Sequence, residues 1–313
     1  MHIYRWDLDR TYLETEIHSM RGLFRAAWEP ASRKRTVAGA ADLAKGLLAD
    51  DERAKLFVLS GSPTQMRRVL SEKLALDGVR VDRIVLKDNL RNLRRGRIRA
   101  LRGQVGYKLP ELLYDRTQHP NEATETLFGD DAEVDAVIYA VYAELVAGRM
   151  GEDDLVALLQ RERAYPDAIA RALAAFRQLE HADAVEDAFI RVDRGVPVEL
   201  YRKLGARVRP VFSWWQAALA LFARGRLSEA STLVVAEGCG LMDRPDVLAG
   251  LAQDAVRRGL IGGEAMLSLF EDTPLDEAAP RARRAVLGLG DTIPPPAVDR
   301  PDYLAFLDAL DAL

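Results

Sequence analysis

The stretch Ile3-Tyr4-Arg5-Trp6-Asp7-Leu8-Asp9-Arg10-Thr11 decides the fold that we expect for this chain of 313 residues. Residues 3–6 are mostly large and apolar, which is typical of a short buried strand. Two aspartates follow that strand directly, with one residue between them. Open α/β sheets place ligand-binding groups just beyond the carboxyl ends of their strands. We therefore expect Asp7 and Asp9 at such an edge, where two carboxylates can share a metal ion and a phosphate.

The first 135 residues alternate short apolar runs with helical patterns, which predicts a parallel α/β sheet. The expected strands are residues 3–6, 55–59, 81–86 and 125–128. The expected helices are residues 37–48, 63–76 and 109–115. From residue 135 helical spacing dominates, except at residues 188–192, an apolar segment that is able to rejoin the sheet. After Gly195 the pattern is again helical. This organisation predicts an α/β domain over residues 1–195, with a helical insertion near 149–186, and a mainly helical domain over 196–313.

The composition is that of a folded protein with no strong charge bias. Hydrophobic residues make up 49% and the net charge is −4, which argues against a nucleic-acid or membrane-surface protein as a whole. The sequence shows no signal peptide, and its most apolar run, residues 212–222, is too short to span a bilayer. The single cysteine excludes an internal disulfide and fits a reducing compartment, so we expect a cytoplasmic protein.

Three further features fall where a strand would end or a helix would begin. The run Leu59-Ser60-Gly61-Ser62-Pro63 offers a hydroxyl after an apolar strand, which suits a clamp on a phosphate oxygen. Lys108 stands at a helix start, where an ammonium group can offset phosphate and carboxylate charge. Asp130, in Gly129-Asp130-Asp131, is placed to supply a carboxylate to Mg²⁺. Taken singly, these features also fit an N-cap, a surface lysine and an acidic helix start, as Asp7 and Asp9 fit a solvated turn.

The order of these motifs over residues 1–148 resembles the series of the haloacid-dehalogenase-like phosphatases. That series is Asp-x-Asp-x-Thr, a strand ending in Ser, a Lys, and a strand followed by Gly-Asp-Asp. The resemblance implies a Rossmann-like parallel sheet and a Mg²⁺-dependent phosphoric monoester hydrolase with an aspartate nucleophile. The implied catalytic residues are Asp7 as nucleophile, Asp9 as acid and base, and Ser60 and Lys108 as phosphoryl-holding groups. The implied metal ligands are Asp7, Asp9 and Asp130, and Asp131 or Asp135 would act on them without touching the metal. The implied substrate-binding residues are Thr11, Gly61, Arg10 and Arg95.

A narrower likeness is to the catalytic domain of actin-patch-associated phosphatidate phosphatases and their bacterial relatives. Residues 59–63, Leu86-Lys87-Asp88 and Gly129-Asp130 followed by Ile138-Tyr139 carry it. Two positions depart from that family, which usually has Asp where Arg10 stands and Ser-Gly where Asp131-Ala132 stand. A cation beside the nucleophile and an extra carboxylate beside the metal would alter substrate choice or activity, so phosphatidate is a lead rather than an assignment.

The largest charge asymmetry lies between Lys87 and Lys108, where eight Lys or Arg residues face one acid, Asp88. One interpretation is a collar that attracts an anionic substrate, such as a phosphorylated lipid, a nucleotide or a nucleic-acid end. The other is a solvated loop whose arginines pair with acids elsewhere. No aromatic residue occurs from 87 to 105, so a nucleic acid would find no base-stacking platform there.

Three hypotheses follow from the sequence. The first is a Mg²⁺-dependent phosphomonoesterase that acts on an anionic substrate. The second is a regulatory module that binds a phosphorylated ligand on the same fold with little or no turnover, which the departures at Arg10 and Asp131 would explain. The third and weakest is a phosphatase of nucleic-acid ends. The helical region beyond residue 195 carries no readable motif, and its partner is not defined by the sequence.

Overall fold

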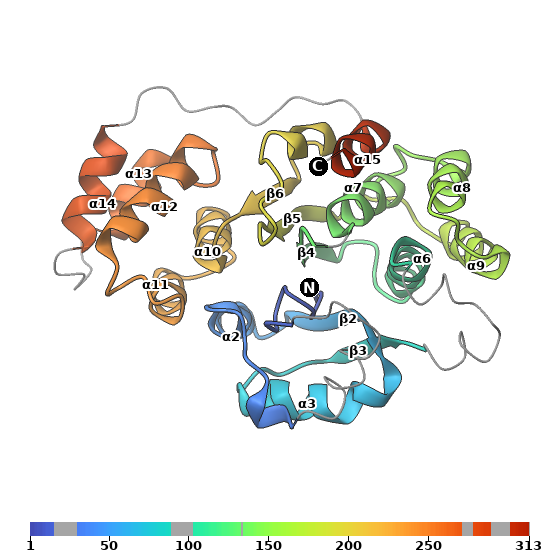
Figure 1. Ribbon diagram of the computed structural model, residues 1–313, viewed down its shortest axis with the longest axis horizontal. Coiled ribbons are helices and arrows are strands. Elements are labelled where there is room, and N and C mark those ends of the chain that lie inside the picture. The colour runs from blue at the N-terminus through green and yellow to red at the C-terminus, as the bar shows by residue number, and fades with distance from the viewer. Residues whose placement is uncertain (16–29, 89–102, 133, 271–277, 289–300, 313) are drawn as a thin grey trace.

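The computed structural model describes residues 1–15, 30–88, 103–132, 134–270, 278–288 and 301–312 (Figure 1). Arg95 and most of the basic stretch between Lys87 and Lys108 lie outside these residues. Within the described ranges, no helix combines the length and the apolar character that crossing a membrane requires.

The fold is α/β and is built on one six-stranded sheet in which all strands are parallel. Its strand order is β3-β2-β1-β4-β5-β6, the order of a Rossmann-like doubly wound sheet. The order reverses at β1, which pairs with β2 on one side and with β4 on the other. The strands are β1 (His2–Trp6), β2 (Lys55–Pro63), β3 (Arg83–Lys87), β4 (Thr124–Asp130), β5 (Val185–Arg191) and β6 (Val208–Val211).

The structure confirms the expected strands at residues 3–6, 55–59, 81–86 and 125–128 as β1 to β4. Residues 188–192 do rejoin the sheet, as part of β5. The expectation of a mainly helical chain after Gly195 did not include β6, a four-residue strand that pairs with β5 among the described strands. Its Pro210 is tolerated because an edge strand needs no second ladder of hydrogen bonds. The sheet therefore continues past residue 195, while the division into two domains there stays a prediction.

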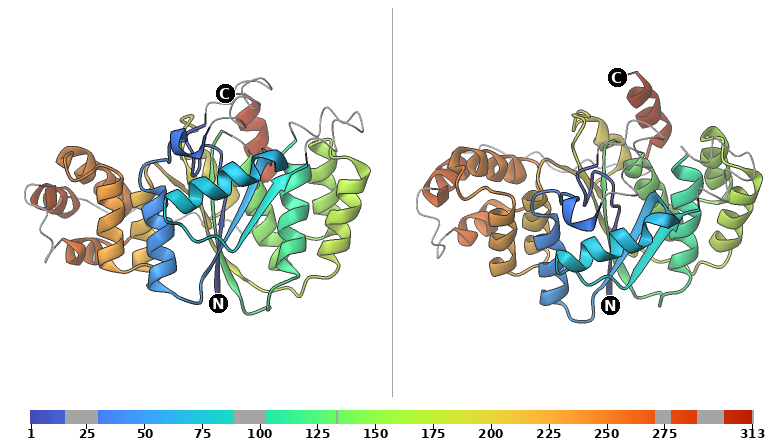
Figure 2. Two further views of the ribbon diagram at one scale, coloured as in Figure 1. Left: turned by 90° about the horizontal axis from the view of Figure 1, so that it is seen from below. Right: turned by 60° about the horizontal axis from the view of Figure 1, so that its bottom comes forward.

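Helices cover both faces of the sheet (Figure 2). One layer packs on Trp6 and Phe128, and its helices are α2 (Ala40–Asp50), α3 (Arg67–Leu76), α10 (Trp214–Ala223), α11 (Glu229–Gly238), α12 (Pro245–Arg257), α13 (Gly263–Leu269) and α14 (Ala278–Leu287). The other packs on Leu127 and Ile190, and its helices are α6 (Val105–Arg116), α7 (Asp135–Val146), α8 (Glu152–Arg161), α9 (Pro166–Phe176) and α15 (Tyr303–Asp311). Short 3₁₀ turns occur at η1 (Ala31–Arg33), η2 (Thr64–Met66) and η3 (Leu200–Leu204).

The helix α6 is tied to the sheet by buried charges rather than by apolar contacts alone. Arg5 of β1 points to the α6 side, where its guanidinium donates to Glu125 of β4 at 2.8 and 3.0 Å. The same guanidinium pairs with Asp115 of α6, and Arg116 of α6 pairs with Glu125 at 3.3 Å. Burial opposes ionisation of Asp115, but the hydrogen bond from His119 and the charge of Arg5 lower its pKa to about 2. This network fixes the position of α6, which carries Lys108.

The buried His2 of β1 predicts a specific loss of stability in weak acid. Its ring nitrogens lie 2.7 and 2.9 Å from the hydroxyls of Thr124 and Thr126. Burial, reinforced by the charge of Arg226, lowers its pKa from 6.5 to about 4. The unfolded chain therefore binds a proton before the folded one does, and stability falls as pH drops from 6.5 to 4. The loss from this one group should reach about 3 kcal/mol.

The measurement is the free energy of unfolding in urea between pH 7 and pH 4, for the wild type and for His2→Gln. Glutamine keeps hydrogen-bonding groups near the two threonines but does not titrate. We expect the variant to lose less stability than the wild type across this interval. Equal losses would show that His2 does not contribute to the pH dependence.

Candidate functional site

The candidate site lies at the carboxyl ends of β1 and β4, where the strand order reverses. Asp7 directly follows β1, and its backbone N–H donates to the carbonyl of Phe128 at 2.9 Å. Asp130 is the last residue of β4. Both side chains are buried. Open α/β sheets bind their ligands in the crevice outside such a switch point. The two aspartates that the sequence placed at strand ends are thus neighbours on adjacent strands.

Three buried carboxylates converge at this point. One oxygen from each of Asp7, Asp130 and Asp135 lies within 4.8 Å of the other two. Asp135 is the first residue of α7, so a helix N-terminus adds its partial positive charge to the group. Carboxylates so close together repel one another strongly in a buried environment unless cations lie among them. The arrangement is therefore one that can hold a metal ion.

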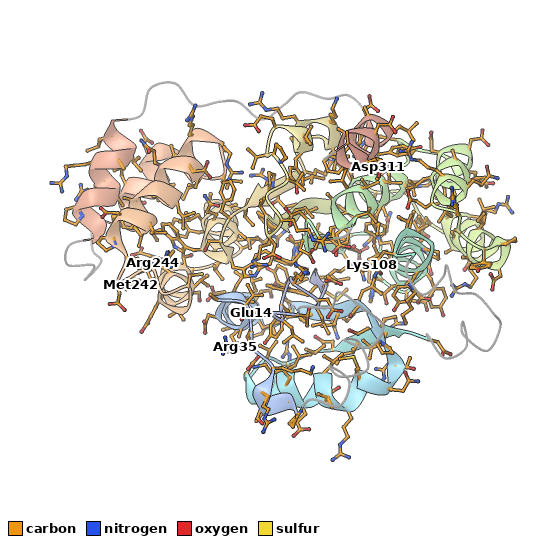
Figure 3. The ribbon with its side chains drawn as sticks, in the orientation of Figure 1. Glu14, Arg35, Lys108, Met242, Arg244 and Asp311 are labelled. Atoms are coloured by element: carbon orange, nitrogen blue, oxygen red, sulfur yellow. The ribbon has the colours of Figure 1, made fainter. Side chains whose placement is uncertain are left out.

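Lys108 of α6 supplies one cation to this group and is labelled in Figure 3. Its side chain is fully buried, and its Nζ lies 2.9 Å from Asp7 Oδ1 and 2.6 Å from Asp135 Oδ1. One ammonium group therefore bridges two of the three carboxylates. The ammonium group thereby offsets part of the repulsion among the carboxylates.

Gly129 permits the close approach of α7 to the end of β4. A Cβ at this position would lie 2.7 Å from Asp135 Oδ2 and 2.8 Å from the ring of Tyr139. The Tyr139 hydroxyl donates to the carbonyl of Phe128 at 3.2 Å. Burial, with the charge of Asp135 added, raises the pKa of Tyr139 well above its usual value, so this hydroxyl keeps its proton. The glycine before Asp130 is therefore a packing requirement of the site.

Asp9 lies against the end of β2. Its Oδ2 accepts hydrogen bonds from the hydroxyl of Ser62 at 2.8 Å and of Ser60 at 3.2 Å. The backbone N–H of Ser62 in turn donates to Ser60 Oγ at 3.0 Å. Asp9 was expected among the metal ligands, whereas the carboxylates that converge within the described chain are those of Asp7, Asp130 and Asp135. The structure thus gives the Asp9 carboxylate two hydroxyl partners.

Thr11 and Gly61, both expected to bind substrate, have different surroundings. The Thr11 hydroxyl is fully buried, 3.0 Å from Asp130 Oδ2 and 3.3 Å from Asp7 Oδ2, so it orients the two carboxylates. Gly61 faces the side chain of Gln104, just before α6; a Cβ on Gly61 would lie 2.6 Å from the Gln104 amide nitrogen. The absence of a side chain at Gly61 therefore lets Gln104, just before α6, approach the end of β2.

The two departures at Arg10 and Asp131 reach the same loop, residues 192–196 after β5. Arg10 has a positive φ of 61°, and its Nη1 donates to Asp193 Oδ2 at 2.8 Å. The Asp131 carboxylate accepts three backbone N–H groups of this loop: those of Asp193 at 2.7 Å, Arg194 at 2.8 Å and Val196 at 3.1 Å. These side chains complement each other, because both hold this loop against the edge of the sheet that bears the site.

Sequence reasoning missed Ser62 and Asp193 and placed Asp135 too far from the centre. Ser62 lies within the quoted Ser60 motif, so the motif itself was the signal. Asp193 follows a strand, as Asp7 does, and the rule for strand ends could have found it. Asp135 opens a helix directly after the Gly-Asp-Asp motif, but only the packing of α7 on Gly129 brings it to the carboxylates.

Comparison of the sequence with protein families, with curated proteins and with solved structures found no match. The site is therefore interpreted from its own geometry and from the order of its motifs.

Removing the Lys108 cation should expose the repulsion among the carboxylates. Lys108→Met leaves Asp7 and Asp135 buried without their shared ion-pair partner, so we expect the free energy of unfolding to fall by about 3–5 kcal/mol. The measurement is urea unfolding in buffer that contains a chelator. Adding Asp135→Asn to Lys108→Met should recover part of this loss. Strictly additive losses in the double variant would contradict a direct interaction between the two residues.

Asp131 predicts a second stability effect. Asp131→Asn replaces one of the two accepting oxygens with an amide N–H₂ that faces backbone donors, so we expect a loss of about 2 kcal/mol. Amide exchange at residues 193–196 should also accelerate. Asp51→Asn is the matched control, because Asp51 accepts one exposed backbone N–H, that of Arg53. A loss no larger than that of the control would show that Asp131 does not hold the loop.

Proposed function

We propose that the protein is a Mg²⁺-dependent phosphomonoesterase of the haloacid-dehalogenase-like type, with Asp7 as its nucleophile. The observation that carries this proposal is the convergence of the buried carboxylates of Asp7, Asp130 and Asp135 at the switch point of a parallel sheet, with Lys108 paired to Asp7 and Asp135. The order of motifs along the chain supports the same chemistry. Its likeness to phosphatidate phosphatases makes phosphorylated lipids one substrate class worth testing.

The donor set suits a hard divalent cation. Mg²⁺ binds through a few carboxylates and completes its coordination with water and substrate oxygens. Asp7, Asp130 and Asp135 are the residues that would hold it, and Thr11 keeps the first two in register through its hydroxyl. When bound, the ion neutralises the excess carboxylate charge and polarises the phosphoryl group.

The remaining steps fall to this chain's own side chains. An oxygen of Asp7 attacks phosphorus, the bond to the leaving oxygen breaks, and an aspartyl-phosphate forms. Asp9 gives its proton to the leaving oxygen and then takes one from the water that hydrolyses the aspartyl-phosphate. Ser60 and Ser62 fix the Asp9 carboxylate through their hydroxyls. Lys108 offsets the negative charge of the phosphoryl oxygens as they approach Asp7.

A second candidate is a regulatory module that binds a phosphorylated ligand with little turnover. It is favoured by the ion pair in which Lys108 holds Asp7 Oδ1 at 2.9 Å, since an ammonium group on the nucleophile lowers its reactivity. The two candidates differ in turnover and agree in the ligand chemistry, so one assay separates them.

The test is phosphate release from 4-nitrophenyl phosphate with and without Mg²⁺. We expect Mg²⁺-dependent turnover that falls by at least about 10³-fold in Asp7→Asn, because that substitution removes the attacking group and little volume. Circular dichroism and the urea midpoint of the variant establish that it is folded. Activity retained by folded Asp7→Asn would reject the mechanism.

The metal requirement is tested by the Mg²⁺ concentration at half-maximal activity. Asp135→Asn should raise this concentration at least about tenfold, because it removes one of the three carboxylates. Asp153→Asn, at an exposed position of α8, is the matched control and should leave it unchanged. Binding of orthovanadate without turnover of any substrate in a broad panel would favour the regulatory module instead.

A further inference from the structure

We propose that Arg10 and Arg191, bridged by Asp193, form a second anion-recognition point at the rim of the site. The preferred substrate would then carry an anionic group in addition to the reacting phosphoryl group. This inference rests on the proposed function and narrows its substrate class. We call these three residues the rim cluster.

The rim cluster has more positive than negative charge. Asp193 Oδ2 accepts from Arg10 Nη1 at 2.8 Å, and Asp193 Oδ1 lies 2.8 Å from Arg191 Nη2. A single carboxylate is thus shared by two guanidinium groups. Arg191 Nη1 also donates to the backbone carbonyl of Arg10 at 2.7 Å, which ties the two arginines to each other. The surplus charge of this cluster is available to an anion.

The rim cluster is fixed next to the reacting groups. Arg191 ends β5 and stands in register with Asp130 of β4. Arg10 follows Asp9 directly, so its backbone belongs to the loop that carries the proposed acid and base. Asp131 holds the backbone of residues 193, 194 and 196 through three hydrogen bonds. Backbone contacts therefore hold the rim cluster on the β5 side of the site, whereas Ser60 lies on the β2 side.

The rim cluster is both accessible and partly desolvated. The side chains of Arg10, Arg191 and Asp193 are 20%, 21% and 24% exposed. Within the described part of the chain, Arg10 uses Nη1 for Asp193, which leaves Nε and Nη2 to donate to a ligand. Guanidinium groups bind carboxylates and phosphates through such pairs of parallel donors.

Electrostatics supply the reason for such a cluster. The centre of the site holds the carboxylates of Asp7, Asp130 and Asp135, with Lys108 paired to Asp7 and Asp135. A substrate with two anionic groups would meet strong repulsion there, even with one divalent cation bound. Two guanidinium groups at the rim reduce that repulsion for the group that does not react. Arg10, which directly follows Asp9, is central to this arrangement.

The experiment compares two substrates that differ by one charge: 4-carboxyphenyl phosphate and 4-carbamoylphenyl phosphate, with the 3-substituted pair assayed in parallel. The readout is the ratio of their kcat/KM values, with kcat and KM resolved. We expect the wild type to favour the carboxylated member of at least one pair. Arg10→Gln should lower that ratio about fivefold, mainly through KM, as expected for the loss of a partly exposed ion pair.

Two controls separate recognition from a general effect. Arg10→Lys keeps the charge and should retain most of the ratio. Arg171→Gln removes an arginine of α9 that is likewise paired with a carboxylate, that of Glu111 at 3.0 Å, and should not change the ratio. A ratio that is the same in Arg10→Gln as in the wild type, or that falls equally in Arg171→Gln, would overturn the inference.

The outcome for the proposed function is read separately. Mg²⁺-dependent hydrolysis of the carbamoyl substrate, whose phosphate is its one anionic group, supports the phosphatase proposal whatever the ratio. Should no substrate turn over, the ratio of dissociation constants for the same two compounds, measured by calorimetry in the wild type and in Arg10→Gln, tests the rim cluster alone. An unchanged ratio of dissociation constants would reject it.

Discussion

The candidate site depends on one buried ion pair system, in which the Lys108 ammonium bridges Asp7 and Asp135. A buried lysine is stable only where carboxylates surround it, and buried carboxylates are stable only where cations lie among them. The burial of Lys108 and the burial of its two carboxylate partners therefore depend on each other. Lys108 offsets part of the repulsion among these carboxylates, and a bound metal ion would offset more. The same ion pairs thus connect the stability of the fold to the metal and phosphate chemistry proposed for it.

Two helices of one layer, α6 and α7, bring the partners of that ion pair to the ends of the central strands. The ion pairs of Arg5 with Glu125 and Asp115 hold α6 against the two central strands. They therefore fix the position of Lys108, which α6 carries. Gly129 has no side chain, so the start of α7 packs close to the end of β4 and Asp135 contacts the same lysine. Two helices that meet β1 and β4 from the same layer therefore deliver opposite charges to one point. The strands β1 and β4 position Asp7 and Asp130, and the helices α6 and α7 bring Lys108 and Asp135 to them.

Much of this could be predicted from the sequence because it follows from local rules. Strand ends and turn residues identified Asp7, Asp130, Ser60 and the parallel sheet without knowledge of tertiary structure. β6 could not be found in this way, because four residues that include Pro210 carry almost no periodic signal. The direct role of Asp135 and the pairing of Arg10 with Asp193 depend on helix packing and on the register between β4 and β5. Such long-range geometry leaves no pattern in a single sequence.

A hydrogen bond from Trp214 links the helical half of the chain to the site. The indole Nε1 of Trp214, at the start of α10, donates to the backbone carbonyl of Thr11 at 3.0 Å, and the Thr11 hydroxyl orients Asp7 and Asp130. Trp214 is fully buried, whereas Phe212 is 48% exposed with Arg258 over its ring. A displacement of α10 would therefore move the two carboxylates through Trp214 and Thr11. Through this contact α10 braces the loop after β1, so the C-terminal half of the chain supports the positions of Asp7 and Asp130.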